Sequence, residues 1–233
     1  MRNSFSTAVF FVATLTGCAS SVHPRSASQI DHVVIGVPNL ESAITEIERL
    51  TGVRPVLGGS HPGRGTHNAL LSLGHGVYLE LIAPQPGAKE TTDNADLTPL
   101  KEPTPVDWAV STGAAESVVA SLRALRFDPS TPEPGSRKTP TGGLLQWRTF
   151  GLNDAPIGAP FFIEWQSSSP HPSTTSPSGC SLLALRVASP DAVALQRLVA
   201  GLGLDVGVRF ASASRISVQL QCPRGQVDFP YAA

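Results

Sequence analysis

Residues 30–37 read Ile-Asp-His-Val-Val-Ile-Gly-Val, and residues 39–41 then read Asn-Leu-Glu. The first run is rich in β-branched residues, which is typical of a strand. Asn39 is a favourable helix N-cap, and apolar residues recur behind it at helical spacing: Ala43, Ile44, Ile47 and Leu50. The stretch therefore predicts a strand followed directly by a helix.

The same pattern returns twice along the chain. Residues 105–110 precede an apolar-periodic stretch at 115–125, and residues 180–187 precede another at 191–202. Further strands follow each helix, and the last of these strands are residues 77–82, 161–165 and 226–229. Aligning the three units places His32, Trp108 and Leu182 at equivalent first-strand positions, and Glu80, Glu164 and Asp228 at equivalent last-strand positions.

A unit of this size cannot close a hydrophobic core alone, so the units must pack together. We expect an α+β fold in which repeated βαβββ modules form curled mixed sheets around a cleft, with the helices outside and a third, shorter βαββ-type unit. The expected boundaries are paired modules at residues 29–166, a breaker-rich linker at 167–179 and the third module of the same domain at 180–233.

Composition excludes several classes of protein. The chain has 233 residues, of which 41% are apolar, enough for a globular core. Lys plus Arg (17) nearly balances Asp plus Glu (18), so no broad positive field exists to hold nucleic acid. The sequence contains no Walker loop, Gly-x-Ser-x-Gly elbow or Cys-x-x-Cys pair. Nothing here indicates a nucleotide cofactor.

The first residues look like an export signal. Arg2 precedes an apolar run at residues 8–15 that is too short to cross a bilayer, so residues 1–17 are expected to be a signal peptide. The following Leu-Thr-Gly-Cys, residues 15–18, is similar to a bacterial lipobox, which implies lipidation of Cys18. An ordinary signal peptide and a misplaced start codon are the alternatives.

Residues 18–28 are small and polar and would form a tether to the lipid. We therefore expect the protein to be exported and lipid-anchored on the periplasmic side of a bacterial envelope. Export permits Cys180 and Cys222 to form a disulfide, although two separate buried thiols are equally compatible with the sequence.

Three segments resemble the glyoxalase-like branch of the vicinal oxygen chelate superfamily. They are Asp-His-Val-Val at 31–34, His-Pro-Gly-Arg-Gly-Thr-His-Asn-Ala-Leu-Leu at 61–71 and Tyr-Leu-Glu-Leu-Ile at 78–82, within the βαβββ repeats. The resemblance covers residues 29–166 well and the third unit more weakly. It implies a divalent metal (Zn, Ni, Mn or Fe) at the mouth of a U-shaped sheet, where substrate oxygens chelate it.

His32 and Glu80 are the expected first pair of metal ligands. Both lie among apolar strand neighbours, where an unpaired charge would be costly. A metal would satisfy Glu80, but so would a proton or a hydrogen bond from His32, Thr66 or Tyr78. The expected third ligand is Glu164 or His67, because the indole of Trp108 cannot bind a metal.

The position of His67 depends on the register of the hairpin after Leu73. A two- or four-residue turn places His67 on the same face as Glu80. A three-residue turn places Asn68 there instead, as a residue that hydrogen-bonds substrate, and leaves His67 outside. The sequence does not decide between these registers.

Three further groups could contact substrate. Arg64 lies in a Gly-rich loop and could reach an anion, and Arg148 shares a strand face with Gln146 that either lines the cleft or faces solvent. Arg137 or Lys138 on the preceding loop could assist Arg148. His171, on the linker, either folds over the cleft or is exposed.

The leading hypothesis is an exported metal-dependent lyase or isomerase. It would act on a small carbonyl or carboxylate molecule, with Glu164 as the base that moves a proton. The alternative is a metal-free small-molecule-binding module at the envelope, whose pocket is lined by Trp108, Trp147 and Trp165. The third unit is expected to pack against the first two or to pair with its copy in a homodimer.

Overall fold

The predicted strand at residues 30–37 is β1 (Gln29–Gly36), and it lies inside an eight-stranded sheet of order β2-β3-β4-β1-β5-β8-β7-β6. The computed structural model describes residues 28–230. The predicted signal peptide, the lipidation site Cys18 and all but the last residue of the tether lie outside this range.

Two βαβββ modules build this sheet. The first contains β1, α1 (Leu40–Thr51), β2 (Val56–His61), β3 (Thr66–Gly74) and β4 (Val77–Pro84). The second contains β5 (Thr104–Ser111), α3 (Ala115–Ala124), β6 (Glu133–Lys138), β7 (Leu144–Phe150) and β8 (Phe161–Trp165). In each module the last strand pairs in parallel with the first, and β1 joins the modules by pairing antiparallel with β5. The predicted α+β fold with paired modules is confirmed.

Helix α1 begins where the sequence predicts. The side chain of Asn39 accepts a hydrogen bond from the Ser42 backbone N–H at 3.0 Å. Gly52 ends the helix in the left-handed conformation, with φ 79°. The buried stripe of α1 packs on the outer face of the sheet, over residues that alternate along each strand.

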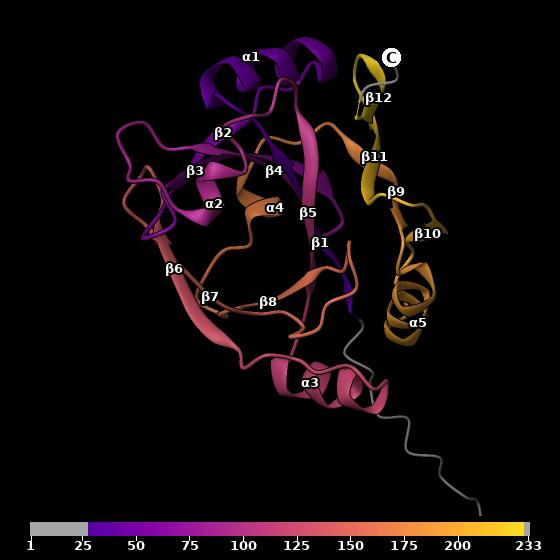
Figure 1. Cartoon of the computed structure of the whole chain (residues 1–233). Helices are drawn as coiled ribbons and strands as arrows, with labels where there is room; N and C mark the ends of the chain where they lie inside the picture. The colour runs from indigo at the N-terminus through magenta and orange to yellow at the C-terminus, as the bar shows by residue number, and fades with distance from the viewer. Residues whose placement is uncertain (1–27, 231–233) are drawn as a thin grey trace, which may run out of the picture.

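The sheet curls until it nearly closes into a barrel, as Figure 1 shows. Helices α1, α3 and α5 lie outside the curve, and the short helices α2 (Thr92–Ala95) and α4 (Pro172–Thr175) lie within it. The hydrophobic core lies on the outer face, so the other alternate residues of each strand point to the concave face. That face is available for a site.

The third unit does not repeat the pairing of the first two. It contains β9 (Ser181–Ser189), α5 (Ala192–Leu202), β10 (Gly207–Phe210), β11 (Arg215–Cys222) and β12 (Gly225–Phe229). These strands form a separate sheet of order β10-β9-β11-β12, in which the last strand does not touch the first. The unit packs against the paired modules and shares their core, as one of the two expected arrangements requires.

Cys180 and Cys222 form a disulfide, with their Cα atoms 4.1 Å apart. This resolves the choice that the sequence left open. The bond joins the residue before β9 to the last residue of β11. Among the helices within residues 28–230, none is long and apolar enough to cross a membrane.

Candidate functional site

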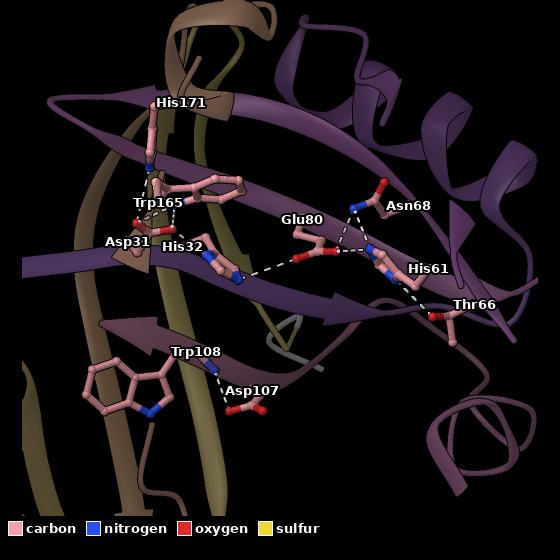
Figure 2. Close-up of polar contacts among 10 residues, drawn as sticks. All are labelled: Asp31, His32, His61, Thr66, Asn68, Glu80, Asp107, Trp108, Trp165 and His171. Carbon is pink, nitrogen blue, oxygen red and sulfur yellow. Dashed lines mark hydrogen bonds and ion pairs between the residues drawn. The ribbon is translucent and has the colours of Figure 1, made fainter. Parts of the chain in front are cut away.

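A row of side chains crosses the concave face at His32. On neighbouring strands His32 pairs with Tyr78 and Ala109, and two residues along the strand Val34 pairs with Glu80 and Asp107. Paired residues present their side chains on the same face of a sheet, so His32, Glu80 and Asp107 share the concave face. Figure 2 shows these residues on their strands.

Around this row lies a connected group of polar side chains, which we call the polar cluster: Asp31, His32, His61, Asn68, Glu80 and His171 (Figure 2). His171 Nε2 lies 3.1 Å from Asp31 Oδ2, and His32 Nδ1 lies 2.7 Å from Asp31 Oδ1. His32 Nε2 then faces Glu80 Oε2 at 3.4 Å. Acidic and imidazole groups therefore alternate along a continuous path through a buried region.

The path continues beyond Glu80. The Asn68 amide Nδ2 donates to Glu80 Oε1 at 2.7 Å and lies 3.2 Å from His61 Nε2. His61 Nδ1 contacts the Thr66 hydroxyl at 2.9 Å. If Asn68 donates to Nε2 of His61, the proton of that imidazole is on Nδ1 and is donated to Thr66. Burial also lowers the pKa of His61, which favours this neutral form.

Asp31 favours the protonated form of His32. Burial alone would lower the pKa of His32, but the hydrogen bond and charge of Asp31, helped by the charge of Glu80, raise it above its usual value. Burial likewise opposes ionisation of Asp31, yet hydrogen bonds from His171 and His32 lower its pKa. His32 thus lies between two carboxylates that both stabilise its protonated form.

Glu80 is the carboxylate nearest the centre of the cluster. Its burial would raise its pKa, but the charge of His32 and the hydrogen bond from Asn68 outweigh burial and lower it. Glu80 is therefore ionised at neutral pH. Aromatic rings flank its partner His32: the centroid of the Tyr78 ring lies 4.5 Å from that of His32 in a stacked arrangement, and the centroid of the Phe161 ring lies 5.4 Å away, edge-on.

Asp107 is a site residue that the sequence analysis missed. It precedes α3 by eight residues, as His32 precedes α1 by eight, so Asp107 is the structural equivalent of His32. The sequence analysis aligned Trp108 with His32, and this alignment is wrong by one residue. Trp108 points into the core, where its indole donates to the Gly158 carbonyl at 3.0 Å. Burial raises the pKa of Asp107 to about 6, although the Trp108 backbone N–H donates to it.

The hairpin between β3 and β4 adopts the register that places Asn68 at the site. Leu70 pairs with Glu80, and Asn68 pairs with Ile82. The shift arises at an irregularity between Ser72 and Gly74, beside a turn in which His75 has a φ of 51°. His67 consequently pairs with the core residue Ala83 and lies on the outer face, away from the polar cluster.

Glu164, the expected base, also lies on the outer face of the sheet, away from the polar cluster. Along β8, Phe161 and Trp165 point to the concave side, whereas Phe162 lies in the core with Glu164 on its side of the strand. Glu164 accepts the Ala115 backbone N–H at the start of α3 and pairs with Arg148. The geometry therefore removes Glu164 from the cluster.

The expected substrate contacts are also rearranged. Arg148 bridges Glu164 and the exposed Glu116 on α3, outside the cluster. Arg64 is exposed in the β2–β3 turn, 3.8 Å from Asp93. His61, which the sequence analysis quoted only as the first residue of the 61–71 motif, is a cluster member, because the short turn at residues 62–65 folds it opposite Thr66. That glycine-rich turn is the signal that could have identified it.

The linker at residues 167–179 crosses the concave face, and we call it the strap. The Ser72 hydroxyl on β3 donates to the Ser173 carbonyl at 2.6 Å, and the Ser72 backbone N–H donates to the Pro177 carbonyl at 2.8 Å. The imidazole of His171 packs edge-on against Tyr78 and Trp165. The strap thus delivers His171 to Asp31 and covers one end of the cluster.

The described residues do not fit the metal centre that the sequence predicts. Such a centre needs at least three donors within about 2.3 Å of one point. Within residues 28–230, no three His, Cys, Asp or Glu side chains converge in this way. The two expected third ligands, His67 and Glu164, both lie off the concave face. No chemical step proposed below uses a metal.

Comparison with known proteins agrees with this architecture. The model of a glyoxalase-like domain matches residues 30–203, most of the chain. The chain belongs to this glyoxalase-like family. It is therefore a member of the vicinal oxygen chelate superfamily. A search of curated proteins finds no match to this glyoxalase-like chain.

Two solved structures are among those similar to this chain. A hypothetical protein from Staphylococcus aureus is 17% identical, with a TM-score of 0.59, and the match covers 81% of this glyoxalase-like chain and 88% of that one. A methylmalonyl-CoA epimerase from Mycobacterium tuberculosis is 19% identical over 63% of this chain and 90% of that one, with a TM-score of 0.45.

A cavity of about 330 Å³ lies elsewhere in this glyoxalase-like chain, between the β3–β4 turn and the third unit. Its lining includes Gln29, His75 and Asp205 but no member of the polar cluster. In the polar cluster, by contrast, several buried ionisable groups contact one another, as is typical of a functional site.

Proposed function

We propose that this protein is a lyase or isomerase that moves a proton within a small carbonyl or carboxylate compound bound on the concave face. The observation that carries this proposal is the buried pair of His32 and Glu80, whose facing atoms are 3.4 Å apart. Each member is held by a second partner, Asp31 for His32 and Asn68 for Glu80.

This arrangement supplies both halves of a proton transfer. Glu80 is ionised and can accept a proton from a carbon next to a carbonyl group. The pKa of His32 is raised by Asp31, so its protonated form is favoured and can donate to the oxygen on which negative charge then develops. Asp31 fixes the ring of His32 through Nδ1, so Nε2 is the atom directed at Glu80 and at any ligand beside it.

The test is solvent exchange. The purified protein is incubated in D2O with a panel of small 2-oxo acids, 2-hydroxy acids and aldehydes, and incorporation of deuterium at carbon is followed by mass spectrometry. Glu80→Gln is expected to reduce exchange by about 100-fold or more, because the base is lost. Glu164→Gln is the matched control, since it neutralises a glutamate outside the cluster, and is expected to keep wild-type exchange.

Equal exchange by wild type and Glu80→Gln would reject the role of Glu80. The same assay is run after chelator dialysis and after addition of Zn²⁺ or Mn²⁺. Exchange that appears only with added metal would reject the metal-free step.

A metal-free binding module is the second candidate function. It is favoured by the aromatic side chains around the cluster, because Tyr78, Phe161 and Trp165 supply apolar surface beside a few fixed polar groups. A compound that binds to the wild-type protein in NMR titrations, yet never exchanges, would establish this function in place of the enzyme.

Export and lipid anchoring through Cys18 also remain part of the proposal. The Cys180–Cys222 disulfide supports export, because structural disulfides persist in oxidising compartments. Labelling of the intact protein with a lipid precursor, compared with Cys18→Ser, tests the anchor.

A further inference from the structure

Arg137 is a buried cation at the seam where the curled sheet nearly closes. It lies on β6, and only 4% of its surface is exposed, whereas its neighbours Ser136 and Lys138 are exposed. Its Nη1 donates to the backbone carbonyl of Gly58 on β2, at the other end of the sheet order. The side chain therefore crosses from the second module to the first.

No carboxylate among the described residues forms an ion pair with this guanidinium, although Glu80 is close enough to attract it. Within residues 28–230, Arg137 takes part in no ion pair, and Gly58 O is its single hydrogen-bond acceptor. A guanidinium carries five N–H donors, so four remain for another group. A buried charge without a paired partner is costly, so the remaining donors need an acceptor.

Arg137 lies beside the polar cluster. Gly58, whose carbonyl accepts from Arg137, packs so closely on Asn68 that a Cβ on Gly58 would lie 2.3 Å from Asn68 Oδ1, and Asn68 in turn donates to Glu80. Arg137 is therefore near enough to affect Glu80 without pairing with it. A ligand between them would have its anionic end at Arg137 and its reacting carbon toward Glu80.

We propose that Arg137 is the subsite for a carboxylate on the substrate. The substrate is then a small carboxylic acid carrying a carbonyl or hydroxyl group, not a neutral aldehyde or ketone. A planar carboxylate can accept two N–H bonds from a guanidinium, a geometry that an ammonium cannot reproduce. This inference rests on the proposed function for the position of the reacting carbon, but the carboxylate subsite can be tested by binding alone.

Binding is measured by ligand-observed NMR with 2-oxobutyrate and its neutral amide, 2-oxobutyramide. Wild type is expected to bind the acid at least about tenfold more tightly than the amide, because a charge-assisted contact is lost in the amide. Arg137→Gln is expected to remove this preference while keeping the affinity for the amide. Lys138→Gln, which removes an exposed positive charge from the same strand, is expected to keep the preference.

A purely structural role at the seam would give a different result. Arg137→Gln would then lower the melting temperature without changing the ratio of acid to amide affinity. Equal affinities for acid and amide in wild type would also overturn the proposal. If Arg137→Gln does not fold, Arg137→Lys decides: a roughly tenfold loss in affinity for the acid supports the subsite, and an unchanged affinity rejects it.

The subsite and the proposed function can fail separately. Arg137-dependent binding of the acid without deuterium exchange would retain the subsite and reject the proton transfer. Exchange that is equally fast with neutral carbonyl compounds would retain the proton transfer and reject the subsite.

Discussion

A bulge in β1 allows two consecutive residues to join the polar cluster. Adjacent residues of a regular strand point to opposite faces, so Asp31 and His32 would normally be separated by the sheet. The pairing of β1 with β5 shifts between Ile30 and His32, and Asp31 is fully buried with its carboxylate bonded to His32. The Trp165 indole also donates to Asp31, at 3.2 Å. One local irregularity therefore creates the Asp–His pair.

Asp107 should destabilise the protein at neutral pH. Its pKa is raised to about 6, so the native state binds its proton more tightly than the unfolded chain does. Unfolding releases that proton between about pH 4 and 6, and stability falls as pH rises through this window. Asp107→Asn should therefore be more stable than wild type by about 2 kcal/mol at pH 8, with the difference vanishing near pH 4.

Urea unfolding at pH 4 and pH 8 measures this difference. Asp154→Asn, at an exposed position, is the control and is expected to show little change at either pH. A stability difference for Asp107→Asn that is the same at both pH values would contradict the assigned titration.

The sequence identified part of the cluster and missed the rest for a geometric reason. His32 and Glu80 lie in strongly apolar strands, which marked them as buried polar groups, and the structure brings them together with Asn68. Asp31 was missed because a bulge in β1 turns its side chain toward the cluster. The nearby Asp107 was missed because the face on which it lies depends on a one-residue shift in how the two modules are aligned. Glu164, predicted as the base, lies on the opposite face of β8 for the same reason, because successive side chains along a strand point to opposite faces.

At the scale of elements, the strap and the β3–β4 hairpin decide how closed the site is. The β3–β4 register depends on an irregularity near the turn. The sequence alone therefore left open whether His67 or Asn68 lies on the same face as Glu80. The strap was recognisable as a linker rich in Pro and Ser, but its path depends on tertiary contacts with Ser72. Short segments of this kind follow the surface on which they pack.

Ser72→Ala should loosen the strap selectively. The variant removes the hydroxyl that donates to Ser173 O but keeps the backbone bond to Pro177. We expect a loss of about 1–2 kcal/mol in stability and faster hydrogen–deuterium exchange in peptides from residues 167–179. Ser136→Ala, at an exposed position of β6, serves as control. Unchanged exchange in the strap would show that Ser72 does not hold it.

At the scale of the whole molecule, the strand order of the third unit could not be predicted from its sequence pattern. Its apolar periodicity correctly predicted a strand followed by a helix, because that signal is local. Strand order is not local: β10 pairs in parallel with β9 and thereby prevents the pairing found in the other modules. The sequence therefore supplied the elements of this unit but not its topology.

The disulfide should stabilise the whole chain. It joins residues 42 positions apart, and closing a loop of that length is worth about 4 kcal/mol through the entropy of the unfolded state. Replacing both Cys180 and Cys222 by Ala should lower the urea midpoint accordingly, with the far-ultraviolet circular dichroism unchanged at low urea. A double variant with the wild-type midpoint would show that the bond adds no stability.

The position of this bond has a consequence for the strap. The strap ends at residue 179, next to Cys180, and begins just after Trp165, which is fixed against Asp31. A segment fastened at both ends samples fewer conformations than a free loop, so placing His171 beside Asp31 costs less entropy. Reduction of the Cys180–Cys222 disulfide, which is far from the reacting groups, would then affect the polar cluster by making the imidazole of His171 harder to order.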